Sequence, residues 1–191
     1  MIGSVRGEVI HLGQDHALID VGGVGYRVVA GPALLAKLRV GTQASVFTHH
    51  LVREDQQALF GFASTEELAF FELLMTVSQV GPRLALAITA AHPVTRLQLA
   101  IVTDDVDVYT SVSGVGRKTA QRILLELKEK VHAAGIAAGG PSSTDSDVVA
   151  ALESLGYSAS EARKAAGAVA GGGGELDTRI KAALQELARS R

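Results

Sequence analysis

Residues 112–123 read "VSGVGRKTAQRI", and residues 77–88 read "VSQVGPRLALAI". The two stretches are offset by 35 residues and share Val, Ser, Val, Gly, Ala and Ile at matching positions. Two copies are too few for a helical solenoid, which needs three or more. A glycine turn that occurs twice, each time ahead of a helical pattern, predicts a paired helix-hairpin-helix unit inside one all-helical domain.

Each glycine turn stands directly before the start of a helix. Glycine lets the backbone turn tightly and lets a ligand approach closely. The first N–H groups of the helix have no partner there and lie at the positive end of the helix dipole, so a phosphate oxygen satisfies both. Nothing in this arrangement reaches a base edge, and we expect sequence-independent binding of a duplex backbone. The candidate DNA-binding residues of the two hairpins are Gln79, Val80, Gly81, Arg83, Gly114, Val115, Gly116, Arg117, Lys118, Thr119 and Arg122.

The first hairpin departs from the second at one position, because Gln79 stands where the second copy has Gly114. A non-glycine residue in the left-handed conformation costs roughly 1–2 kcal/mol, so we expect a slightly different turn there. A plain interhelical turn is the alternative for both copies. An ATP-binding P-loop is excluded, because Arg117 occupies the glycine position that the motif requires before Lys118 and Thr119.

The composition narrows the class of protein. The chain has 191 residues, 47% of them hydrophobic, a net charge of −2 and no cysteine. These values indicate a globular protein without disulfides or thiolate metal sites, and without a visible signal peptide we expect it to be cytoplasmic. The acidic total argues against a simple basic DNA binder. However, no acid lies between Glu72 and Asp104 or between Asp107 and Glu126, while both windows carry basic residues, so a basic face can form.

Residues 1–63 read as a β domain. Five short strands, among them 17–21, 25–29, 44–52 and 58–62, with one short helix near 31–38, predict a Greek-key barrel of the OB type. An open β-meander is the alternative. The few aromatic residues here argue against the base stacking that single-strand binding needs.

Residues 64–133 read as helices, with a capping box at Ser64 and Glu67, and Glu126 and Lys130 spaced as an i,i+4 pair on the last helix. Residues 134–144 are small and glycine-rich and read as a flexible linker. Residues 145–191 show a three-helix pattern, which at this size is more typical of a docking module than of an active site.

The loop "REDQQ" at 53–57 carries Glu54 and Asp55 at its tip. A solvated hairpin turn explains these residues. Paired carboxylates could also hold a metal for nuclease chemistry, yet no third ligand has suitable spacing. We therefore expect no catalytic residue, no metal and no cofactor. A nuclease or lyase, and an adaptor that binds no nucleic acid, remain the competing functions.

The motifs "MIGSVRG", "VGGVGY", "FTHHLVREDQQALFGF", "VGPRLALAI", "GVGRKTAQRILLELK" and "ALESLGY" together resemble the RuvA family, the Holliday-junction-binding subunits of the bacterial branch-migration complex. The resemblance covers nearly the whole chain. It implies a non-catalytic homotetramer with fourfold symmetry, sometimes doubled into an octamer, that binds an open four-way junction in recombination and repair.

The resemblance also implies roles for residues outside the hairpins. Glu54 and Asp55 would form an acidic pin that repels phosphates at the crossover, with Arg53 beside it as a further DNA contact. The C-terminal module, UBA-like in this family, would dock the RuvB ATPase, and the RuvC resolvase is a further partner. The candidate docking residues are Leu152, Leu155, Tyr157 and Leu184, whose alternative role is the internal core of the module.

Overall fold

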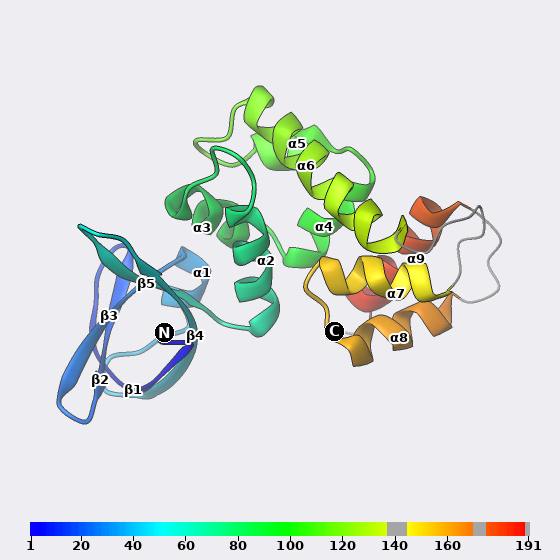
Figure 1. The fold of residues 1–191 in the computed structure, drawn as a ribbon. Coiled ribbons are helices and arrows are strands. Elements are labelled where there is room, and N and C mark those ends of the chain that lie inside the picture. Colours follow the sequence, from blue (N-terminus) through cyan, green and yellow to red (C-terminus); the bar gives the residue numbers. More distant parts are fainter. Residues whose placement is uncertain (137–144, 170–174, 190–191) are drawn as a thin grey trace. The chain divides into compact units, whose positions relative to one another are not determined.

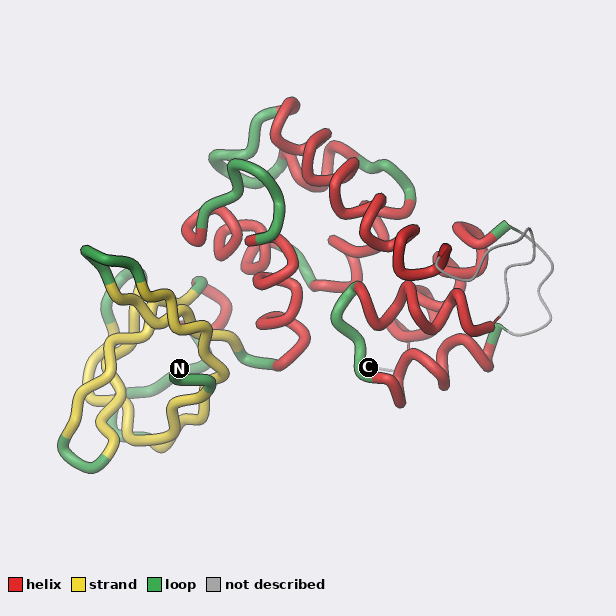
Figure 2. The backbone as a smooth tube through the Cα atoms, in the orientation of Figure 1, coloured by secondary structure: helices red, strands yellow, loops and turns green. Residues whose placement is uncertain are grey.

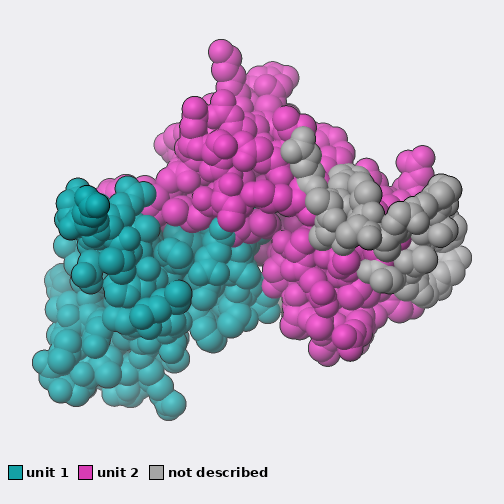
Figure 3. All heavy atoms as spheres, viewed as in Figure 1, with its two compact units in different colours: residues 1–72 teal, residues 73–191 magenta. Residues whose placement is uncertain are grey.

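The computed structural model describes residues 1–136, 145–169 and 175–189 (Figure 1). Contacts divide the chain into two compact units, residues 1–72 and 73–191 (Figure 3). The division into three domains with boundaries near residues 63 and 145 remains a prediction. The greater part of the linker expected at 134–144 lies outside the described residues.

The first unit contains a closed five-stranded barrel, as predicted, and not an open meander (Figure 1). The strand order around the barrel is β1-β2-β3-β5-β4, with β3 and β5 parallel and the other neighbours antiparallel. A one-turn helix, α1, lies between β3 and β4. The bounds are β1 Ser4–Leu12, β2 His16–Val21, β3 Val24–Ala30, α1 Pro32–Leu35, β4 Gln43–Val52 and β5 Gln57–Phe62.

Alternating side chains fill the barrel, with Val9 and Ile19 fully buried in its core. Closure depends on a close approach at Gly61, near the end of β5. A Cβ there would lie 2.4 Å from Val28 Cγ1 and 2.9 Å from Val46 Cγ1. Only glycine therefore lets β5 fit between β3 and β4.

Helix α2, Thr65–Met75, joins the barrel to the rest of the chain. Glu67 N–H donates to Ser64 Oγ at 3.3 Å, as the predicted capping box requires, while the Glu67 carboxylate accepts from the amide of Ala63 at 2.9 Å. Phe71 is fully buried, with its ring centroid 4.8 Å from that of Phe62. The boundary between the two units falls inside this helix, after Glu72.

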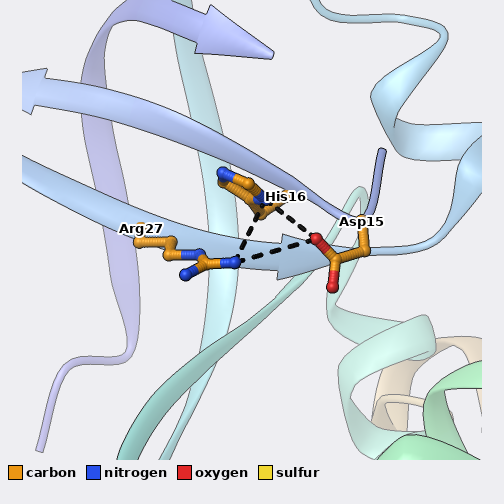
Figure 4. A network of polar contacts seen from close by, with 3 residues as sticks. All are labelled: Asp15, His16 and Arg27. Atoms are coloured by element: carbon orange, nitrogen blue, oxygen red, sulfur yellow. Dashed lines mark hydrogen bonds and ion pairs between the residues drawn. The ribbon is translucent and has the colours of Figure 1, made fainter. Parts of the chain in front are cut away.

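A polar network lies on the surface of the barrel (Figure 4). Asp15 Oδ1 is 2.8 Å from Nδ1 of His16 and 3.9 Å from the Arg27 guanidinium. The hydrogen bond with His16 is the main reason that the pKa of Asp15 is lowered from its ordinary value.

The second unit is helical (Figure 2). Its helices after α2 are α3 Pro82–Ala91, α4 Val94–Val102, α5 Val106–Thr110, α6 Arg117–Ile136, α7 Asp145–Ser154, α8 Ala159–Ala168 and α9 Leu176–Arg189. Tyr109 of α5 is fully buried, and its hydroxyl donates to the carbonyl of Leu97 at 2.9 Å. Ile123 and Leu127 place the apolar face of α6 in the same core. Ala85 and Ile88 of α3 are fully buried as well, so both helices that follow the glycine turns contribute side chains to the buried interior of the second unit.

Helix α6 ends at Ile136, so residues 134–136 of the expected linker are helical. Ala133 and Ala134 are strong helix formers and favour the extension, whereas Gly135 opposes it.

The C-terminal helices follow the predicted pattern. Ser158 and Glu161 form a complete capping box at the start of α8. Helix α7 packs against α6 and α9 packs against α4. The buried amide of Gln98 on α4 donates to the carbonyl of Leu155, so a central helix and the C-terminal helices share a polar contact.

Among the described residues, no single helix has the length and apolar character to cross a membrane. Helices α3 and α4 reach that length and composition only as a pair, and the chain bends by 100° between them.

Candidate nucleic-acid interface

The two predicted hairpins have the same backbone turn. Val80 N–H donates to the carbonyl of Val77 at 3.1 Å, and at the equivalent place in the second hairpin Val115 N–H donates to the carbonyl of Val112 at 3.0 Å. All four valines are buried, with Val80 and Val115 each 6% exposed. The valine side chains therefore anchor each turn in the core, and only the backbone of Val80 and Val115 can contribute to a contact with DNA.

Helices α3 and α6 also begin in the same way. Ala85 N–H donates to the carbonyl of Gly81, and Ala120 N–H donates to the carbonyl of Gly116, both at 2.9 Å. The N–H groups between each glycine and alanine have no acceptor within the helix, and the first hairpin has one fewer of them because Pro82 carries no N–H. Both hairpins thus direct a set of helix N-terminal amides away from the helix, at the end where an anion is stabilised.

The residue before each valine is in the left-handed conformation. Gln79 has φ 66° and Gly114 has φ 89°. The expectation that the first hairpin would turn differently is wrong, because Gln79 accepts the conformation that glycine adopts in the second copy. The second turn also contacts the first hairpin's helix, since a Cβ on Gly114 would lie 3.5 Å from Leu84 Cδ1 of α3.

The glycines that follow the valines face open space. A Cβ built on Gly81 or on Gly116 would meet nothing within 4 Å, and neither residue has a left-handed φ. Both are exposed. Neither internal packing nor backbone conformation requires glycine at these two positions. The space in front of both is open to a ligand that approaches the backbone.

Basic side chains surround these openings. Arg83 on α3 and Arg117 and Lys118 on α6 are exposed, and Thr119 is partly exposed. Arg122 is different, because it is half-buried and its guanidinium donates to Oε1 of Gln79. The structure therefore leaves three of the predicted basic residues available to a phosphate and engages the fourth within the protein.

The acidic loop is a tight turn at the end of the β4–β5 hairpin. Arg53 N–H donates to the carbonyl of Gln56 at 2.8 Å, which leaves Glu54 and Asp55 at the tip. Both carboxylates and the Arg53 side chain are exposed. Within the ranges that the structure describes, no group of three or more His, Cys, Asp or Glu side chains could hold a metal ion.

The four candidate docking residues are all buried. Leu152 and Leu155 are fully buried, Leu184 is 1% exposed and Tyr157 is 5% exposed. In this structure they belong to the core, which is the alternative that the sequence left open, and a docking role for them stays a prediction.

Three family models match consecutive segments of the chain. The RuvA N terminal domain matches residues 1–61, a SAM-like helix-hairpin-helix tandem matches 71–129, and the RuvA C-terminal domain matches 145–188. Proteins named Holliday junction branch migration complex subunit RuvA are similar over most of their length. The one from Mycobacterium avium is 46% identical over 86% of this chain and 85% of its own, and that from Rhodococcus opacus is 44% identical over 86% of each.

The chain belongs to the RuvA family.

Sequence reasoning about this RuvA-family chain missed one set of contacts. Glu126 and Lys130 were predicted to pair with each other, yet no such ion pair occurs between these two described residues. Glu126 Oε2 accepts instead from the amide of Ser78 at 3.0 Å, and Lys130 Nζ donates to the carbonyl of Thr76 at 3.2 Å. The signal in the sequence was the four-residue spacing that places Arg122, Glu126 and Lys130 on one helix face.

Proposed function

We propose that this chain binds four-way DNA junctions by their shape and backbone, without reading base sequence. The observation that carries the proposal is the pair of matched hairpins. Each presents open helix N-terminal amides beside a glycine that no internal contact requires. The exposed Arg83 follows the first glycine, and the exposed Arg117 and Lys118 follow the second. Amides and basic side chains of this kind hold phosphates and leave base edges unread. The names of its relatives, subunits of a Holliday junction complex, support the same function.

The hairpins at 79–83 and 114–118 would hold phosphates on one arm through the backbone amides that are not used within the turns. Arg83, Arg117, Lys118 and Thr119 would add attraction and a hydroxyl donor. One chain would hold one arm. A homotetramer with fourfold symmetry would then present four equivalent pairs of hairpins to four arms, and two such tetramers would form the octamer.

Glu54 and Asp55 would act in the opposite sense. Two exposed carboxylates on a tight turn repel phosphates, so at the crossover they would keep strands apart and direct them toward the arms. Arg53, at the base of the same turn, would hold a phosphate that passes beside it. The turn itself needs no catalytic chemistry for this role.

The chain would be a non-catalytic subunit. Its relatives are named as subunits of a branch migration complex, and we infer that the motor is supplied by the RuvB ATPase, which binds the C-terminal helices, with the RuvC resolvase acting on the bound junction. We further place this activity in the cytoplasm. A docking role for the four buried candidate residues requires that the C-terminal module expose them when the ATPase binds.

A gel-shift experiment tests the proposal. The full chain is titrated onto a labelled four-way junction and onto a linear duplex of equal length, with Mg²⁺ present. We expect preferential binding of the junction and no strand cleavage. Equal affinity for the two DNAs would contradict shape recognition, and cleavage would support the nuclease alternative. Failure to bind any DNA at low salt would favour the adaptor alternative.

A further inference from the structure

One face of α6 holds the loop that precedes the first hairpin. Arg122 donates to Gln79 Oε1, and four residues later Glu126 Oε2 accepts from the amide of Ser78. After four more residues, Lys130 Nζ donates to both the carbonyl and the hydroxyl oxygen of Thr76. Three side chains at four-residue spacing thus contact successive parts of one loop, residues 76–79, which we call the α2–α3 loop.

These contacts are polar and lie at the surface. Thr76, Ser78 and Gln79 are all exposed, so burial of their side chains contributes little to keeping the loop in place. The buried anchors Val77 and Val80 fix the two ends of the turn. Side chains of α6 contact the exposed residues between them, Ser78 and Gln79.

The contacts also involve two specific features of the loop, the left-handed conformation of Gln79 and the backbone amide of Ser78. Gln79 has φ 66°, a conformation that costs a non-glycine residue roughly 1–2 kcal/mol. A charge-assisted hydrogen bond from Arg122 stabilises the side chain of that residue. The amide of Ser78 is likewise bound by a carboxylate, although it lies in an exposed turn.

Helix α6 begins directly after the turn of the second hairpin. A side chain on α6 that binds the α2–α3 loop therefore joins one hairpin directly to the other. Leu84 of α3, which lies beside Gly114, is a second and apolar link between them.

We infer that Arg122, Glu126 and Lys130 are positioning residues that hold the first hairpin in register with the second, so that both sets of amides meet one DNA backbone. The inference rests on the proposed function, since register between the hairpins matters only if both bind DNA. It reassigns Arg122, which the sequence marked as a phosphate contact: its effect on binding passes through Gln79.

A double-mutant cycle with salt titration tests the role of Arg122. Junction affinity is measured from low to moderate salt for wild type, Arg122→Ala, Gln79→Ala and the double variant. A hydrogen bond to a charged group corresponds to about a tenfold change in affinity, so each single variant should bind about tenfold more weakly and the double variant no worse than either. The salt dependence of log affinity should keep its wild-type slope.

Two further variants calibrate the measurement. Lys118→Ala removes an exposed charge proposed to meet phosphate, and it should lower the salt slope. Lys128→Ala removes one positive charge from the same helix, but Lys128 Nζ donates to Asp104 at 2.8 Å and not to the loop, so affinity should stay within about twofold of wild type. If Arg122→Ala lowers the slope as Lys118→Ala does, and its effect multiplies with that of Gln79→Ala, Arg122 is a phosphate contact and the inference fails.

A second measurement tests the positioning role without DNA. Hydrogen exchange at the Ser78 amide should be slow in wild type, because this exposed N–H is bound to Glu126. Glu126→Ala should speed exchange by about tenfold, and Glu126→Gln, which keeps an acceptor oxygen, should restore most of the protection. Unchanged exchange in Glu126→Ala would overturn the inference. Absence of junction binding by the wild-type chain would instead overturn the proposed function.

Discussion

The two hairpins of this chain have the same backbone conformation at the turn, but different residues adopt it. In the second, Gly114 adopts a left-handed φ at no steric cost. In the first, Gln79 adopts a left-handed φ as well, and its side chain binds Arg122 of the other hairpin's helix. Both copies therefore share the geometry of the turn, although they differ in sequence at this position. Glycine is one way to obtain this geometry, and a side chain stabilised from outside is another.

The glycines at 81 and 116 allow the strongest test of whether the two hairpins act alike. Gly81→Val and Gly116→Val each place a side chain in space that is open in the free chain. We expect each to lower junction affinity by more than about tenfold, because charge-assisted hydrogen bonds to phosphate are lost, while the thermal midpoint of unfolding stays unchanged.

Gly3→Val is the matched control, since a Cβ at Gly3 also meets nothing within 4 Å and Gly3 belongs to neither hairpin. It should leave affinity unchanged. A large loss at only one of residues 81 and 116 would show that one hairpin carries the binding, and a loss of stability at both would show that the open space is needed for folding.

Exchanging the left-handed residues sharpens the comparison. Gly114→Ala forces a Cβ into φ 89° and should lower the free energy of unfolding by about 1–2 kcal/mol. Gln79→Gly relieves a similar cost but gives up the contact with Arg122 and adds freedom to the unfolded chain, so its net effect should be near zero. Denaturant unfolding measures both. A clear gain in stability for Gln79→Gly would mean that the contact with Arg122 contributes nothing.

Removing charge from the acidic turn should change junction affinity in the opposite direction to removing charge from the basic hairpins. Replacing Glu54 and Asp55 with Gln and Asn should leave junction affinity equal or raise it by up to about fivefold, the scale of an exposed charge interaction. Branch migration with the motor present should change. Gel shift and a strand-displacement assay measure the two effects. Markedly weaker binding would contradict a repulsive role.

The smallest expected effect is on the pH dependence of stability, at Asp15. Because Asp15 lies outside both hairpins, it also serves as a control for junction affinity. Its pKa is lowered from 3.8, mainly by the hydrogen bond with His16, so the folded chain binds this proton less readily than the unfolded one. The associated stability is present above pH 3.8 and is lost as the pH falls below that value through the lowered pKa. Asp15→Asn should remove only this part of the pH dependence of unfolding and leave junction affinity unchanged. A change in affinity would show that Asp15 takes part in binding.

Much of the fold could be predicted because its determinants are local. Runs of β-branched, aliphatic and aromatic residues indicated the strands of the barrel, and Ser64 with Glu67 marked the start of α2. The repeated Val-Ser-x-Val-Gly turns identified both hairpins. Their physical requirements, a left-handed residue and a buried valine, can be inferred from a few consecutive letters.

The rest depends on contacts between distant parts of the chain. Arg122 and Gln79 are 43 positions apart, and nothing in either segment alone shows that they bind each other. Leu155 and Tyr157 show a second limit. A single amphipathic pattern marks an apolar face without telling whether the same chain or a partner covers it, and here the protein itself buries both side chains.

The salt dependence of junction affinity tests the central claim most directly, because an acidic protein with net charge −2 must bind DNA through local amides and basic residues. Affinity is measured between 50 and 200 mM salt for two junctions of unrelated sequence. If the assembly neutralises about 6–10 phosphates, affinity should fall by about 10³–10⁵-fold over this range, along the same line for both junctions. A flat response, or lines that differ with base sequence, would contradict the account.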